Sequence, residues 1–242
     1  MDFNQSSPRL IVALDFHSTE QAWDLIHQID SDDVILKVGS EMFTLFGPEF
    51  VRALVKKHFK VFLDLKFHDI PNTVARACAS AADLGVWMIN VHASGGVPMM
   101  EAAVNAIQPF GQEKPLLIAV TVLTSLTEVQ FCDIGISRSL HQQVFTLGEL
   151  AYRTGLDGVV CSVHEVPMIK QRCGQSFLTI TPGIRVDTEQ RKDDQARIAT
   201  VQQAVDLGSD YLVVGRPITQ AINPRQIIKN ILACISKKKG LL

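Results

Sequence analysis

The chain has 242 residues, of which 47% are hydrophobic, and its 23 basic and 25 acidic side chains nearly cancel. This length allows one large hydrophobic core or two small ones. The balanced charge argues against a general affinity for nucleic acid or for a membrane surface, and no stretch approaches the roughly 18 apolar residues of a membrane span.

The cysteines and the first residues bear on the compartment. The five cysteines, at positions 78, 132, 161, 173 and 234, form no CxxC pair and no spacing typical of a disulfide framework, which fits a reducing compartment. The beginning, MDFNQSSPRL, lacks the basic segment and the apolar stretch of a secretory signal. We therefore expect a cytoplasmic protein.

Short apolar segments rich in Val, Ile and Leu recur along the chain. In order they are LIVALDF from 10, VILKVGS from 34, VFLDLKF from 61, WMINVHA from 87, LLIAVTVL from 116, GVVCSV from 158, LTITPGI from 178 and YLVVGRP from 211. Between them lie helical patterns at 20–29, 49–57, 73–85, 125–135, 139–155 and 225–235, with apolar residues three or four apart. The alternation predicts strands and helices in turn.

The strand segments are apolar almost throughout, which is typical of parallel strands covered on both faces. Eight such units in 242 residues predict an α/β fold, a (β/α)₈ barrel forming a single domain over residues 1–242, since about 250 residues is usual for it. The alternative is an open doubly wound sheet, but the first strand is not followed by the GxGxxG turn of that fold.

Charged residues interrupt the third strand. Asp64 and Lys66 are two positions apart, so on a strand both side chains point to the same face. A single buried Asp–Lys pair is more often structural than catalytic. Asp15 and Lys37 also follow apolar strands, however, and in a barrel all four would meet at the C-terminal mouth, where active sites lie. Such an alternating network can hold an ammonium ready to deliver a proton.

The last two strands suggest an anion site and a mobile cover. Gly215 and Arg216 precede a short predicted helix that begins with Pro217, an arrangement that suits a phosphate or, alternatively, only a tight turn. After Arg185 the chain is polar for more than ten residues, as in a solvated loop or in an active-site lid. The seven histidines show no HxH or HExxH spacing, so no metal site is predicted.

The segment DLKFHDIPNT, residues 64–73, resembles the signature D-x-K-x-x-D-I-P-x-T of the orotidine 5′-phosphate decarboxylases. The similarity covers nearly the whole chain, in further blocks that end at or contain Asp15, Lys37, Thr124, Arg185, Gln195 and Arg216. DxKxxD alone also occurs in metal-dependent sugar-phosphate enzymes, whereas all seven blocks in this order are specific to the decarboxylases.

The resemblance implies conversion of orotidine 5′-monophosphate to uridine 5′-monophosphate without a metal or organic cofactor. Lys66 would protonate the C6 carbanion, Asp64 would lie beside the departing carboxylate, and Lys37 and Asp69 would complete the network. Asp69 and Thr73 would reach the neighbouring subunit's site, which implies a homodimer.

The remaining contacts implied by the resemblance surround the substrate. Asp15 and Lys37 would bind ribose hydroxyls, Thr124 and Ser125 would lie near the pyrimidine, and Arg185 would flank the phosphate. The phosphate itself would be held by Gln195, with Gln190 as the alternative glutamine, and by Gly215 and Arg216.

Two other functions remain open at this point. A metal-dependent decarboxylase or aldolase acting on a sugar phosphate shares DxKxxD, but such relatives carry a metal-binding glutamate where Lys37 stands. A non-catalytic nucleotide-binding barrel would keep Arg216 and Gln195 without needing the charged network. The intact network favours the decarboxylase.

Overall fold

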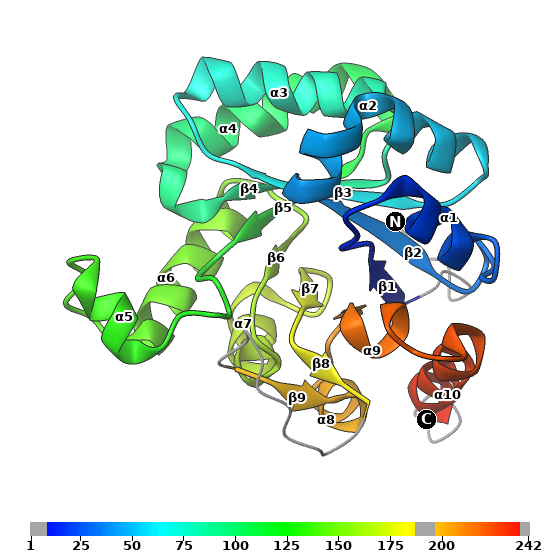
Figure 1. Cartoon of the computed structure of the whole chain (residues 1–242). Helices are drawn as coiled ribbons and strands as arrows, with labels where there is room; N and C mark the ends of the chain where they lie inside the picture. Colours follow the sequence, from blue (N-terminus) through cyan, green and yellow to red (C-terminus); the bar gives the residue numbers. More distant parts are fainter. Residues whose placement is uncertain (1–8, 187–196, 238–242) are drawn as a thin grey trace.

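The computed structural model describes residues 9–186 and 197–237. Eight parallel strands close into a barrel, because β10 pairs with both β7 and β1 (Figure 1). The closed barrel confirms the predicted fold and excludes the open sheet. Its strands are β1 (Leu10–Ala13), β2 (Ile35–Gly39), β3 (Val61–Phe67), β4 (Met88–His92), β5 (Leu116–Val120), β6 (Gly158–Val160), β7 (Leu178–Thr181) and β10 (Tyr211–Val214).

Helices follow the strands and form the outer layer. They are α1 (Thr19–Ile26), α2 (Ser40–Lys56), α3 (Pro71–Asp83), α4 (Gly96–Ile107), α6 (Leu140–Arg153), α7 (Val166–Cys173), α8 (Val201–Asp206) and α10 (Pro224–Lys237). Two short helices lie in strand-to-helix loops, α5 (Glu128–Asp133) and α9 (Arg216–Thr219). The described residues also form the 3₁₀ turns η1 (Ala93–Gly95), η2 (Gln108–Glu113) and η3 (Val163–Glu165). Within the described ranges, no helix is both long and apolar enough to cross a bilayer.

Two elements differ from the sequence prediction. The helix expected at 49–57 is the second half of α2, which already begins at Ser40 and is broken at Gly47, where φ is 67°. The expected strand 178–184 is split, because Pro182 lacks a backbone N–H and Gly183 has a φ of 78°. The residues beyond this break form β8 (Ile184–Arg185), which pairs with β9 (Ala199–Thr200) outside the barrel.

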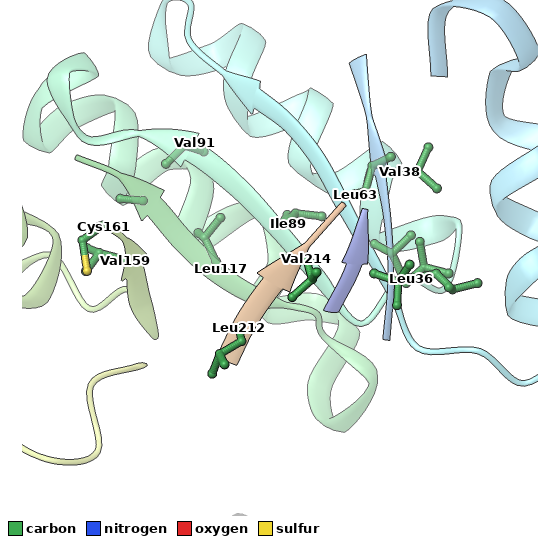
Figure 2. Packing of buried hydrophobic residues seen from close by; sticks show 14 of the residues in the cluster. Leu36, Val38, Leu63, Ile89, Val91, Leu117, Val159, Cys161, Leu212 and Val214 are labelled. Carbon is green, nitrogen blue, oxygen red and sulfur yellow. The ribbon is translucent and has the colours of Figure 1, made fainter. Parts of the chain in front are cut away.

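The strand side chains divide between two cores. Side chains that point outward, among them Leu36, Leu63 and Ile89, pack under the helices (Figure 2). The residues next to them, such as Ile35, Phe62 and Met88, fill the barrel interior. Because side chains alternate along a strand, the next inward positions toward the C-terminal ends are 37, 64 and 90. All three carry polar side chains.

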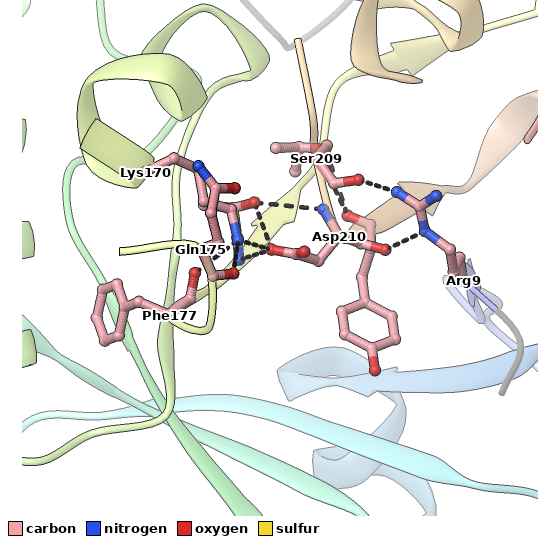
Figure 3. Close-up of polar contacts among 9 residues, drawn as sticks. Arg9, Lys170, Gln175, Phe177, Ser209 and Asp210 are labelled. Atoms are coloured by element: carbon pink, nitrogen blue, oxygen red, sulfur yellow. Dashed lines mark hydrogen bonds and ion pairs between the residues drawn. The ribbon is translucent and has the colours of Figure 1, made fainter. Parts of the chain in front are cut away.

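A polar cluster ties together the elements at the opposite end of the barrel, where β7 and β10 begin (Figure 3). The Lys170 ammonium lies 2.6 Å from Asp210 Oδ2 and donates to the backbone carbonyls of residues 175 and 177. The same Asp210 oxygen accepts from the backbone N–H and the hydroxyl of Thr179. Arg9 donates to the Asp210 carbonyl. This cluster joins α7, β7 and the chain before β1.

Candidate active site

A cavity of about 280 Å³ opens at the C-terminal ends of the barrel strands. Residues from seven of the eight strands or their following loops line it. They are Ala13, Asp15, Lys37, Phe62, Asp64, Lys66, Val120, Val122, Leu123, Thr124, Ser125, Val160, Ile180, Pro182, Gly183, Arg185, Val213, Gly215, Arg216 and Pro217. The predicted positions 15, 37, 64, 66, 124, 125, 185, 215 and 216 therefore share one cavity.

The charged residues form a chain of ion pairs across the cavity floor. Asp64 lies between two ammonium groups, with Oδ2 3.2 Å from Lys37 Nζ and Oδ1 2.8 Å from Lys66 Nζ. Lys37 Nζ also lies 3.5 Å from Asp15 Oδ1. The side chains of Lys37 and Asp64 are each 11% exposed, whereas that of Lys66 is 34% exposed. Of the two ammonium groups that line the cavity, that of Lys66 is thus the more open.

The ion pairs determine the charge states of the two buried residues, Lys37 and Asp64. Burial alone would lower the pKa of Lys37, but the carboxylates of Asp64 and Asp15 outweigh it and the pKa is raised. Burial alone would raise the pKa of Asp64, but the charges of Lys37 and Lys66, with hydrogen bonds from Lys66 and Asn90, lower it overall. Each group therefore keeps its charge because its neighbour is charged.

Close packing beside the ion pairs explains a glycine in the second strand. A Cβ atom at Gly39 would lie 3.3 Å from Lys37 Nζ and 3.7 Å from Asp15 Oδ1. A larger residue would push the ammonium away from one of its carboxylate partners. The glycine thus leaves the room in which the Lys37 side chain lies between Asp15 and Asp64.

Lys66 has an unusual backbone conformation, which the sequence analysis did not foresee. Its φ is 54°, in the left-handed region that costs a non-glycine residue on the order of 1–2 kcal/mol. Its backbone N–H donates to Asn90 Oδ1 at 2.8 Å, and Asn90 Nδ2 donates to Asp64 Oδ1 at 2.7 Å. Asn90 was also missed; its signal is a polar residue at an inward position of the otherwise apolar strand around Val91.

The loop after β5 forms another wall of the cavity. Thr124 in this loop is buried, and Ser125 follows it at the cavity lining. Arg197 supports the loop, because its guanidinium donates to the backbone carbonyls of Val122 and Leu123 and pairs with the buried Glu165. Neither Arg197 nor Glu165 was predicted.

Two predicted residues that the structure describes do not line the cavity, and a third lies outside the described residues. Asp69 is exposed, and its Oδ1 accepts a hydrogen bond from the backbone N–H of Ile70. Thr73 lies in the first turn of α3, beyond Ile70, and is partly exposed. Gln195 and its alternative Gln190 lie outside the described residues.

The donor set at the cavity floor suits ammonium groups better than a divalent cation. Among the described residues, Asp15 and Asp64 are the carboxylates that line the cavity, and Lys37 Nζ lies within 3.5 Å of an oxygen of each. A metal bound to these two carboxylates would compete with a buried ammonium for the same oxygens. In the part of the chain that the structure describes, no group of three His, Cys, Asp or Glu residues could hold a metal ion.

Comparison with known proteins finds a family model and relatives that match nearly the whole chain. The family model described as "Orotidine 5′-phosphate decarboxylase / HUMPS family" matches residues 8–231. An orotidine 5′-phosphate decarboxylase of Legionella pneumophila (strain Corby) is 58% identical over 226 residues, which cover 93% of this chain and 98% of the relative.

Solved structures agree with this similarity. Orotidine 5′-phosphate decarboxylase from Lactobacillus acidophilus matches with a TM-score of 0.83 and 36% identity, over 95% of this chain and 99% of that one. The enzyme from Methanocaldococcus jannaschii, complexed with inhibitor BMP, matches with a TM-score of 0.77 over 95% of this chain and 99% of that one. It is 23% identical, so it supports the fold alone.

Proposed function

The chain belongs to the orotidine 5′-phosphate decarboxylase / HUMPS family, and on that premise we propose how its cavity removes carbon dioxide from orotidine 5′-monophosphate. The product is uridine 5′-monophosphate, and the reaction is a step of pyrimidine biosynthesis. The observation that carries the proposal is the Lys66 ammonium, which lies 2.8 Å from Asp64 and is open to the cavity.

The proposed chemistry is a replacement of carboxylate by a proton at C6. The bond between C6 and the carboxylate carbon breaks, carbon dioxide leaves, and the electron pair stays on C6. The Lys66 ammonium gives its proton to that carbon and is later reprotonated from solvent. An sp² carbanion is a poor intermediate, so a fixed positive charge beside C6 lowers the barrier before the proton moves. Asp64 keeps that charge in place and lies beside the departing carboxylate.

The other cavity residues hold the rest of the nucleotide. Asp15 and Lys37 bind the ribose hydroxyls, and Thr124 with Ser125 lies against the pyrimidine. Gly215 and Arg216 bind the phosphate. Arg216 is the first residue of the short helix α9. Arg185 flanks the phosphate, and Gln195 adds a further contact to it. Because the phosphate is remote from C6, its binding energy can assemble the site around the reacting carbon.

The ion pairs favour this chemistry over the metal-dependent reactions of related barrels. In those enzymes a glutamate ligand stands in place of Lys37. Here Lys37 pairs with Asp15 and Asp64, so the carboxylates are already satisfied by ammonium groups. The proposed reaction therefore needs no metal, and the resemblance to the family implies that it needs no organic cofactor either.

A homodimer would complete the site. Asp69 and Thr73 do not line the cavity of their own chain, and Asp69 is exposed on the segment between β3 and α3. Ile70, next to it, is 67% exposed, which suits burial by a second copy of the chain. We therefore assign Asp69 and Thr73 to the partner's cavity. The five unpaired cysteines fit an enzyme of the reducing cytoplasm.

Chelation tests the absence of a metal. Purified protein should convert orotidine 5′-monophosphate at an unchanged rate after exhaustive treatment with EDTA, because ammonium groups supply the positive charge. The measurement is the loss of substrate absorbance. A rate that collapses with EDTA and returns with Mg²⁺ would contradict the proposal.

Substitution of Lys66 tests the proton donor. Lys66→Ala should lower kcat by several orders of magnitude, beyond the roughly 10²–10⁴ of general acid catalysis, because charge stabilisation is lost as well. Steady-state rates and thermal unfolding of the variant should be measured together. A folded variant within about tenfold of the original rate would remove Lys66 from this role.

Hybrid dimers test the shared site. Lys66→Ala and Asp69→Ala should each be nearly inactive, but mixed dimers should regain activity. If each site takes Lys66 from one chain and Asp69 from the other, one site of the hybrid carries both changes and the other carries neither. Differently tagged chains, remixed under mild denaturation, allow hybrids to be isolated. Verified hybrids without recovered activity would show that the two residues act in one chain.

A substrate without phosphate tests Arg216. Arg216→Ala should lose several kcal/mol of transition-state stabilisation on orotidine 5′-monophosphate, since charge-assisted bidentate contacts are strong. Gln195→Ala should lose less, because a neutral amide forms a weaker bond. On orotidine, which lacks the phosphate, wild type and Arg216→Ala should have nearly equal kcat/KM. Equal damage on both substrates would assign Arg216 to the fold instead.

A further inference from the structure

We propose that Asn90 is a positioning residue that holds Lys66 and Asp64 in their working geometry. The inference rests on the roles proposed above for these two residues. Asn90 is fully buried inside the barrel on β4 and does not line the cavity. It can therefore act on the reaction only through its neighbours.

The pairing of β3 with β4 changes register beside Asn90. Leu63 pairs with Ile89 and Phe67 pairs with Val91, so residues 64 to 66 stand opposite Asn90 alone. Such a bulge leaves backbone groups without their usual ladder partners and re-aims the side chains it carries. Here the Asn90 side chain supplies a partner, because its Oδ1 accepts from the Lys66 N–H at 2.8 Å.

The hydrogen bond from Lys66 to Asn90 stabilises an uncommon backbone conformation at Lys66. A residue with a long side chain rarely has a φ of 54°, the value at Lys66, and this backbone conformation persists only where the surrounding contacts stabilise it. The bond from the Lys66 backbone N–H to Asn90 fixes the peptide that enters this conformation. The direction in which the Lys66 side chain leaves the strand follows from it.

The other end of the amide holds the carboxylate. Asn90 Nδ2 donates to Asp64 Oδ1 at 2.7 Å, the same oxygen that lies 2.8 Å from Lys66 Nζ. A backbone N–H can only donate and an ionised carboxylate can only accept, so a single orientation of the amide satisfies both contacts. One buried side chain thus fixes the backbone of the proton donor and the carboxylate that pairs with it.

Two variants separate hydrogen bonding from packing. Asn90→Ala removes both hydrogen bonds and leaves a space, whereas Asn90→Leu removes both bonds but keeps the branched shape in a slightly larger side chain. Both should lower kcat about 10²-fold, because a misplacement of about 1 Å at the reacting groups has an effect of this size. The dissociation constant of uridine 5′-monophosphate should change less than about threefold, since the Asn90 hydrogen bonds described above go to Lys66 and Asp64 and not to the groups proposed for ribose, pyrimidine and phosphate.

Thr179→Val is the matched control. Thr179 is also fully buried on a barrel strand, and its hydroxyl donates to the carboxylate of Asp210 at the other end of the barrel. This variant should lower the thermal unfolding midpoint as the Asn90 variants do while leaving kcat unchanged. A merely structural Asn90 would behave in the same way.

The outcomes distinguish this inference from the function on which it rests. If Lys66→Ala is inactive but both Asn90 variants keep kcat within about threefold of wild type, the positioning role is overturned and the role of Lys66 stands. If Asn90→Ala lowers kcat but Asn90→Leu has the kcat of wild type, Asn90 acts by packing and the inference is again wrong. If Lys66→Ala itself remains active, the proposed function fails.

Discussion

The ion pairs that Asp64 forms with Lys37 and Lys66 determine the structure at the C-terminal ends of the barrel strands. A charge buried without a partner is very unfavourable, and removing one member of a buried pair leaves the other uncompensated. Lys37 and Asp64 are almost completely buried, so neither could remain charged alone. The space beside Gly39 and the bulge at Lys66 are local solutions that allow these charges to meet.

Much of this arrangement could be predicted from the sequence because it follows from period-two alternation. Once the apolar strands were recognised as barrel strands, Lys37 and Asp64 had to point the same way as Ile35 and Phe62, into the interior. The C-terminal ends of parallel strands then bring the side chains together. Asp15 and Arg216, which lie two residues beyond the ends of their strands, were placed by the rule that strand ends meet at the barrel mouth.

The rest depends on contacts that no local pattern contains. Regular alternation also puts Lys66 inward, but it gives no sign of the left-handed backbone, which lies where the pairing of β3 with β4 changes register. Asn90 lies 24 residues after Lys66, and its role is visible only when the two strands are side by side. Arg197 meets the carbonyls of Val122 and Leu123 across an even longer stretch of chain.

Lys–Asp pairs lie at both ends of the barrel, and comparing Lys170–Asp210 with Lys66–Asp64 shows what distinguishes a structural pair from the pair proposed to react. At the N-terminal end, the Lys170 side chain is 7% exposed, and its ammonium has Asp210 and two backbone carbonyls as acceptors. An ammonium has three protons to donate, so this one is fully occupied.

At the other end, the Lys66 side chain is 34% exposed, its ammonium lies 2.8 Å from Asp64 Oδ1, and it lines the cavity. The same chemical pair therefore gives different properties at the two ends. Lys170 joins α7 to β7 and β10, and its ammonium has no proton left to donate to a ligand. Lys66 is fixed through Asp64 on one side and faces the cavity on the other, as the proton transfer proposed for it requires.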